Sequence, residues 1–406
     1  MSGRRLGVGL AAGLVAAALV LLVAFQWRPA AVTSRNESPA PSVVAAGSPT
    51  LGTSPTASPS GAIASITPSA PPATSPSPTP TVGPSLVPGP LDGLPTSAAA
   101  AAQHPIAVMV DDLGPARPQS GFSAASIVWQ APAEGGIPRY MMIFNEKVPK
   151  SVGPIRSSRL YYIAWAAEWR AVYVHVGGSP QALATLASKG HGQLVYNADG
   201  YRYEGRYLFR ITTRNPPHNE YSDAVHLRSL SKLVGAKDAP LTPAWTFGPD
   251  APVASRPVGG SIDVSYAANH IHYAYDRISN TYRRSVTGEK VQVDAATGQR
   301  VAPKNVISIV MHFGPLNDGH PDKKRLEADF VGSGRAWVST NGVTVRATWR
   351  KASITAPTLL FDAAGRPIRL TAGQTFVQVV PSAGDLRFTT GRAAPAGRPS
   401  NVPGLR

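Results

Sequence analysis

Two arginines in a tight turn are the residues whose types and spacing most clearly suggest chemistry. Arg156 and Arg159 lie in the segment 153–159, which runs into an apolar stretch that predicts a helix over 160–169. Arginine carries a permanent charge and a planar fork of donors that suits carboxylate and phosphate groups. Free backbone amides at a helix start also favour anions. The turn therefore indicates an anion-binding site, with a pair of solvated surface arginines as the simpler alternative.

Further charged residues follow buried segments of the same region. The apolar run 104–110 predicts a strand that ends at Asp111, and strand ends commonly carry chemistry. Arg117 follows in a polar loop. Glu134 and Arg139 flank a turn with two glycines, whose conformational freedom allows the two side chains to meet. An exposed ion pair is the alternative interpretation of Glu134 and Arg139.

Histidine and hydroxyl residues add to this candidate set. His175 lies near the end of an alternating run that predicts a strand over 171–176, where a packed, hydrogen-bonded histidine is the alternative to a functional one. Ser179 is a good N-cap for a predicted helix that extends to about residue 188, and the start of that helix exposes amide donors. Glu168 has the chemistry of a general base, with a helix-surface charge as its alternative.

The segment 214–219 offers Arg214, His218 and Asn219 around a rigid diproline at 216–217, which favours a site there over a plain loop. A helix is predicted over 222–233. These elements make an α/β or α+β first domain over residues 103–245.

A second domain is predicted over residues 250–390. Short alternating runs separated by turn signals such as Asn341-Gly342 indicate a mostly antiparallel β domain. His270, His272 and His312 lie in it, but no spacing of histidines and carboxylates favours a metal site. Residues 391–406 are predicted to form a flexible tail.

The amino-terminal segment predicts a membrane anchor. Arg4 and Arg5 precede an apolar run over 6–25, long enough to cross a hydrocarbon core of about 30 Å. The charge pattern places the short amino end in the cytoplasm and the carboxy-terminal ectodomain outside. A cleavable signal peptide is the alternative, but the length of the run favours a retained transmembrane signal-anchor over 1–31.

A disordered linker over 32–102 follows, because this Pro-, Ser-, Thr- and Ala-rich stretch lacks the apolar residues that build a core. The chain contains no cysteine, which excludes disulfides, thiolate metal sites and lipid attachment to a cysteine.

The charge of the chain lies in its globular part. The net charge is +16, and residues 1–100 hold four arginines and two acidic residues, which leaves +14 on the rest. For a chain outside the membrane, this excess favours an anionic cell-wall polymer or a phosphorylated lipid carrier as partner. Nucleic acid is the less favoured partner.

The order of these segments resembles the YerB-like family of bacterial envelope proteins, whose amino-terminal domain has no known function. The resemblance extends over about residues 103–382. It implies an envelope-associated protein and no established activity. Asp112 stands where the resemblance implies Asn, and the lipid-bearing Cys of many members is missing. The segments that carry the resemblance are 107–111, 116–121, 134–139, 153–159, 175–182 and 217–219.

Three functions stay open. The first is a module that binds an anionic, phosphate- or carboxylate-bearing envelope ligand through an arginine-rich cleft. The second is a phosphotransferase on pyrophosphoryl-lipid-linked polymers, similar in organisation to the LytR-CpsA-Psr enzymes. In that case the four arginines bind pyrophosphate, Asp111 binds Mg²⁺, and His218 or Glu168 assists proton transfer. The third is a wall-associated scaffold. Convergence of Asp111 and the arginines in one cleft would distinguish these functions.

Overall fold

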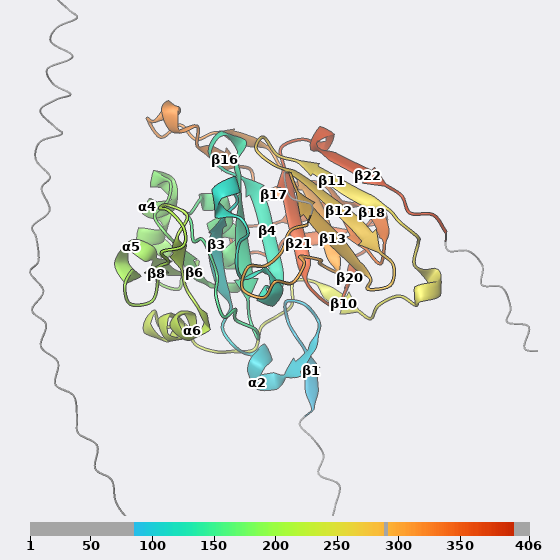
Figure 1. Ribbon diagram of the computed structural model, residues 1–406, viewed down its shortest axis with the longest axis horizontal. Coiled ribbons are helices and arrows are strands. Elements are labelled where there is room, and N and C mark those ends of the chain that lie inside the picture. The colour runs from blue at the N-terminus through green and yellow to red at the C-terminus, as the bar shows by residue number, and fades with distance from the viewer. Residues whose placement is uncertain (1–84, 288–290, 394–406) are drawn as a thin grey trace, which may run out of the picture. The chain divides into compact units, whose positions relative to one another are not determined.

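The protein is rich in β-structure and has few helices. Its structure, a computed structural model, describes residues 85–287 and 291–393 (Figure 1). Ten strands form one mixed sheet. Their order from edge to edge is β19 (Leu359–Phe361), β18 (Val343–Lys351), β17 (Gly332–Thr340), β14 (Asn305–Val310), β21 (Thr375–Val380), β4 (Ile127–Pro132), β5 (Pro138–Phe144), β3 (Ile106–Asp111), β6 (Val172–His175) and β7 (Tyr196–Asp199).

Residues from both predicted domains share this sheet. Strand β21 pairs in parallel with β4, in the register Thr375↔Ile127, and on its other side with β14. Strands β4, β5 and β3 are antiparallel neighbours, and β6 and β7 continue the sheet in parallel with β3. Backbone hydrogen bonds therefore join the two regions, in addition to side-chain packing.

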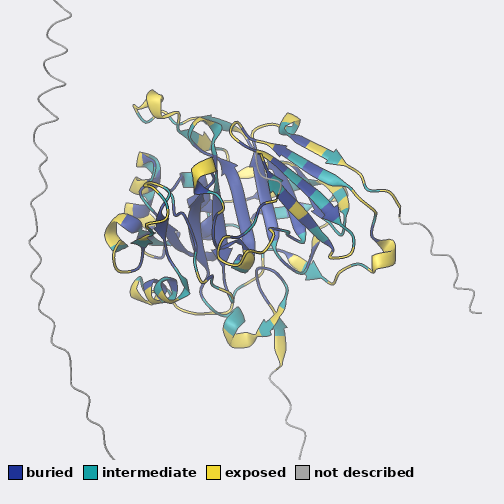
Figure 2. Ribbon diagram, viewed as in Figure 1, coloured by how far each residue is buried: buried dark blue, intermediate teal, exposed yellow. Residues whose placement is uncertain are grey.

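A second, antiparallel sheet covers one face of the large one. It contains β13 (Thr281–Val286), β12 (His270–Asp276), β11 (Ser261–Ser265) and β22 (Leu386–Thr389). Alternate residues of β3, such as Val108 and Val110, pack in one core with Ile271 and Tyr273 of this sheet. The small sheet shows the alternation of buried and exposed residues that a half-covered sheet requires (Figure 2).

The opposite face of the large sheet packs against helix α3 (Leu160–Ala166). Met109 of β3 belongs to this core, and Trp165 of α3 stacks on Trp129 of β4 with ring centroids 4.4 Å apart. Figure 1 labels most of the remaining elements. They are α2 (Ala98–Ala101), α4 (Pro180–Lys189), α5 (Gly200–Tyr203), α6 (Ala224–Leu233) and the pairs β1 (Leu86–Pro88)–β2 (Pro95–Ser97), β8 (Phe209–Arg210)–β9 (Glu220–Tyr221), β10 (Thr246–Gly248)–β20 (Arg369–Thr371) and β15 (Phe313–Pro315)–β16 (Leu326–Ala328).

The folded part begins earlier than the sequence predicts. Residues 86–101 fall in the predicted linker, yet they form β1, β2 and α2. Leu91 is 1% exposed and belongs to the core on the α3 face. The carboxylate of Asp92 accepts hydrogen bonds from the Leu94 amide and the Ser126 hydroxyl. Composition alone missed this segment because one buried leucine among prolines and alanines leaves no periodic pattern.

No helix in residues 85–287 and 291–393 is long and apolar enough to span a membrane. The predicted anchor over 6–25 and the linker up to residue 84 lie outside the described residues, as does the tail from residue 394.

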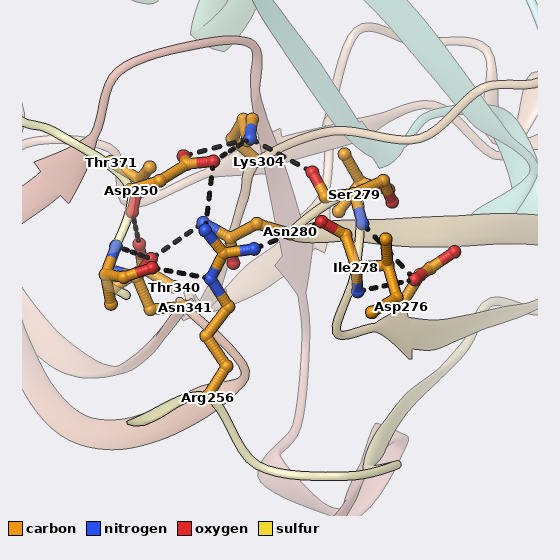
Figure 3. A network of polar contacts seen from close by, with 12 residues as sticks. Asp250, Arg256, Asp276, Ile278, Ser279, Asn280, Lys304, Thr340, Asn341 and Thr371 are labelled. Carbon is orange, nitrogen blue, oxygen red and sulfur yellow. Dashed lines mark hydrogen bonds and ion pairs between the residues drawn. The ribbon is translucent and has the colours of Figure 1, made fainter. Parts of the chain in front are cut away.

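A polar network ties the turns of the small sheet to the large one (Figure 3). Asp250 accepts from the ammonium of Lys304 at 2.8 Å, and Arg256 donates to the carbonyl oxygens of residues 277 and 278 in the β12–β13 turn. Asn280 of that turn donates to Asn341 of the β17–β18 turn at 2.7 Å. These contacts fix the two sheets relative to each other at this end.

Candidate functional site

The carboxylate of Asp111 is the centre of the candidate site. It lies at the carboxyl end of β3, and its side chain is 3% exposed. The segment that follows the Gly153-Pro154 turn runs beside β3, where Ile155 bridges to Val110 and the Arg156 amide donates to the Met109 carbonyl at 2.9 Å. This pairing brings the Arg156 side chain to Asp111.

Two cationic or hydrogen-donating side chains share one oxygen of Asp111. Oδ2 accepts from Nε of Arg156 at 2.8 Å and from Nδ1 of His218 at 2.6 Å, while Oδ1 accepts from the Leu113 amide. Because Nδ1 of His218 faces the carboxylate, Nε2 is the free ring nitrogen, and it has no partner among the described residues. A carboxylate that orients a histidine in this way is a common feature of general-base sites.

His218 reaches Asp111 because two backbone segments approach closely. The Ile155 amide donates to the Glu220 carbonyl at 2.7 Å, and Val152 bridges to Ser222. A Cβ at Gly153 would lie 2.7 Å from that same Glu220 oxygen, so only glycine fits between the segments.

Glu134 holds two further arginines beside Asp111. It accepts from Arg139 at 2.7 Å and forms an ion pair with Arg159. Arg139 is the direct cross-strand partner of Asp111 in the β3–β5 register. Burial lowers the pKa of both guanidiniums, and for Arg139 the nearby Asp111 carboxylate is the main opposing influence. The predicted proximity of Glu134 and Arg139 is therefore present, and the pair is largely buried.

A pocket of about 490 Å³ opens beside His218. Arg117 enters it from the loop after β3, where its guanidinium bonds to Asp112 and, at 2.5 Å, to Asn269 of the β11–β12 turn. Arg214 donates to three backbone carbonyl oxygens of that loop. The lining residues are Pro115, Arg117, Thr213, Arg214, Asn215 and His218.

The charges of this region do not cancel. Five arginines, at positions 117, 139, 156, 159 and 214, meet three carboxylates, at positions 111, 112 and 134. Arg214 has only neutral carbonyl partners, and Arg156 uses only its Nε. The site therefore carries excess positive charge at a pocket that solvent reaches.

Comparison with known proteins identifies the family of this chain. A model of the N-terminal domain of a protein of unknown function (DUF3048) matches residues 91–237, and the corresponding C-terminal domain matches residues 262–377. The Bacillus subtilis (strain 168) protein named "Putative lipoprotein YerB" is 30% identical over 296 residues, which are 72% of this chain and 86% of that protein. The chain belongs to the YerB family. The resemblance seen in the motifs is thus confirmed.

A solved structure of the YerB family supports the fold as well. The crystal structure of the YerB protein from Bacillus subtilis matches with a TM-score of 0.66 at 26% identity, over 74% of this chain and 99% of that chain. The match includes nearly the whole of that YerB chain.

Asp112 departs from the Asn that the YerB resemblance implies. Its carboxylate is fully buried and bonds to Arg117, Gln130 and Asn269. Burial raises its pKa, and the guanidiniums of Arg117 and Arg284 oppose that rise. Asp112 therefore acts as a buried link between β3 and the β11–β12 turn, and it positions Arg117.

Two predicted residues of this YerB-family chain lie in other contacts. His175 is fully buried, with Nδ1 2.8 Å from the Gly177 carbonyl oxygen and Nε2 2.8 Å from Oδ1 of Asn197. Ser179 is buried and caps α4 by accepting from the Ala182 amide. Both side chains have their hydrogen bonds filled within the protein, which fits a structural role.

Asn219 and Glu168 also have partners other than Asp111. Asn219 accepts from Arg210 and donates to the Ile211 carbonyl, which holds the β8–β9 segment together. The side chain of Glu168 is 0% exposed and pairs with Lys351 at 2.9 Å, so it is neither a surface charge nor a neighbour of Asp111 by any contact among the described residues.

The role of Arg214 and the contribution of Asn269 escaped prediction. Arg214 lies in the segment singled out around His218, but nothing in its spacing showed that it would hold the loop of Arg117. Asn269 belongs to the second family domain, 152 residues from Arg117, and an Asn in a hairpin turn has an ordinary turn role as its first interpretation.

The donors around Asp111 do not fit a Mg²⁺ ion. Mg²⁺ requires near-octahedral oxygen coordination, but Oδ2 of Asp111 already accepts from Arg156 and His218. In residues 85–287 and 291–393, no group of three or more His, Cys, Asp or Glu side chains is arranged to hold a metal ion. The Asp111 carboxylate therefore binds side chains of the protein itself, Arg156 and His218.

Proposed function

We propose that this YerB-family chain is a membrane-anchored, extracytoplasmic envelope protein that binds an anionic ligand in the pocket beside His218. The ligand carries a phosphate or carboxylate group, as on a cell-wall polymer or a phosphorylated lipid carrier. The observation that carries the proposal is the pocket lined by Arg117, Arg214 and His218, next to an arginine excess over carboxylates. Anions are attracted by such an excess, and guanidinium groups bind them with directed hydrogen bonds.

The envelope location rests on separate support. The apolar run over 6–25 has the length of a membrane span, and the related Bacillus subtilis protein is named a lipoprotein. A transmembrane anchor here would replace the lipid anchor, because the chain has no cysteine to acylate.

Thermal unfolding of the full chain in detergent, with pyrophosphate or citrate, tests the binding proposal. A ligand at one hundred times its dissociation constant stabilises the native state by about 2.7 kcal/mol. We expect this shift in the wild type and its loss in Arg214→Ala, because the Arg214 guanidinium lines the pocket and has no carboxylate partner. Arg202→Ala removes an equal charge from the exposed α5 surface and should keep the shift. Absence of any shift with either anion would refute the proposal.

A phosphotransferase is the second candidate, favoured by the 2.6 Å contact between Asp111 and His218. In this candidate, Nε2 of His218 takes the proton of the attacking hydroxyl while the arginines stabilise the charge on the phosphoryl group. Release of phosphate from farnesyl pyrophosphate by the wild type, and its loss in His218→Gln with pyrophosphate binding retained, would support it. Binding without turnover would leave only the first proposal.

A further inference from the structure

A row of arginines lies on the outer strands of the large sheet, away from the pocket. Arg335 of β17 and Arg346 and Arg350 of β18 are exposed. We call the surface formed by these three residues the arginine face. None of the three forms an ion pair among the described residues, whereas the arginines around Asp111 and Glu134 do.

The strand register puts all three side chains on one side of the sheet. Trp337 is directly opposite Arg346, and Arg335 is opposite Thr348, which lies midway between Arg346 and Arg350. Paired residues of antiparallel strands point to the same face, and so do residues two apart. The three arginines therefore follow one another along the strand direction at intervals of about 7 Å.

Aromatic rings on the same face as this row already contact other groups. Trp337 stacks on Phe388 of β22 at 5.5 Å, and the Arg350 guanidinium lies 4.8 Å from the centroid of the Phe361 ring. Single-stranded nucleic acid binds by stacking bases on free aromatic faces, in addition to charge contacts. With these rings covered on one side by other groups, the surface favours a charged chain without bases.

We propose that the arginine face binds a linear anionic polysaccharide along the direction of β17 and β18. Charge complementarity selects an anion, because three guanidiniums without a carboxylate partner among the described residues lie together. Their regular spacing selects a polymer, because a repeating chain presents its charges at regular intervals. This surface is separate from the pocket, and the proposal does not depend on the proposed function.

Binding of the full chain to polygalacturonate, a linear sugar polymer with one carboxylate per unit, tests the proposal. The test variant is Arg335→Ser with Arg346→Ser, and the control is Arg202→Ser with Arg206→Ser, which removes two exposed arginines elsewhere. We expect the test variant to bind about tenfold more weakly, since each lost surface contact contributes a few-fold. The control should bind like the wild type. Equal weakening of both variants would overturn the proposal, because it would indicate only overall charge.

Salt and competing polymers provide a second measurement. The slope of log affinity against log salt should fall by roughly 1.4 in the test variant, since each lost cation contact removes about 0.7. Neutral dextran should not bind. Tighter binding to oligothymidylate or to poly-glutamate than to polygalacturonate would overturn the assignment to a polysaccharide.

Discussion

The buried pair Glu168–Lys351 allows a sharp test of how charge is held in this fold. The two side chains are 0% and 1% exposed, with Nζ 2.9 Å from Oε1. Thr358 also donates to Oε1 at 2.7 Å, and Lys351 donates to the Ala356 carbonyl. Burial raises the pKa of Glu168, opposed by Lys351, and lowers the pKa of Lys351, opposed by Glu168. The charged form of each side chain is therefore stabilised by the opposite charge on its partner.

The change Lys351→Met removes the ammonium but keeps most of the stem that packs in the core. It leaves Glu168 as a buried carboxylate with only Thr358 as a partner. Removing one partner of a buried ion pair lowers the free energy of unfolding by about 3–5 kcal/mol. Replacing both partners with uncharged groups often changes it little. We therefore expect Lys351→Met to lose about 3–5 kcal/mol at pH 8, and Glu168→Gln with Lys351→Met to lose much less.

The loss should depend on pH. An unpaired, buried Glu168 has a folded pKa above its unfolded value, so the folded state keeps a proton that the unfolded state releases. Its destabilising effect grows as pH rises above the unfolded pKa and disappears below it. The cost of Lys351→Met should therefore be smaller at pH 5 than at pH 8.

Urea unfolding followed by tryptophan fluorescence measures these differences as shifts of the midpoint at constant slope. Equal costs for the single and double variants at pH 8 would refute the reasoning. Pyrophosphate should still stabilise Glu168→Gln, because Glu168 contacts Lys351 and Thr358. Loss of that stabilisation would indicate that Glu168 contributes to anion binding.

Two further predictions concern the site and the amino-terminal part of the fold. Asn269→Ala removes the side chain that holds Arg117 and Asp112, so pyrophosphate should bind roughly tenfold more weakly, given about 1–3 kcal/mol for a buried polar group left unpaired. Titration followed by calorimetry measures this, and wild-type affinity in the variant would show that Arg117 needs no such support. Burial, followed by the neighbouring Asp92, raises the pKa of Glu146 to about 7. The folded state therefore keeps the Glu146 proton at a pH where the unfolded carboxyl is already ionised. The free energy of unfolding should fall as pH rises toward 7. Glu146→Gln should flatten this dependence and add roughly 1–2 kcal/mol at pH 8, after allowance for its partial exposure; parallel stability curves for variant and wild type would contradict it.

Much of the local structure was predictable from periodicity and turn residues. The apolar run before Asp111 is β3, the stretch after Arg159 is α3, and Ser179 caps α4. These features depend on neighbours in the chain, so hydrophobic spacing and capping chemistry are enough to find them. The same holds for Glu134 and Arg139, which a short glycine turn brings together.

The site was only partly predictable, because residues that were equally good candidates in the sequence have different contacts in the structure. Arg156 and His218 converge on Asp111, whereas His175 and Asn219 are tied into internal hydrogen bonds. Sequence spacing offers no way to separate these cases, since each residue type suits both roles.

The sequence by itself therefore determined the local elements and the charge of the globular part. Tertiary structure alone decided which charges meet. His218 reaches Asp111 across 107 residues, and Asn269 and Lys351 reach partners in the other family domain. The order of strands in the large sheet sets these encounters, and that order follows from burying apolar faces of the whole chain rather than from any local pattern.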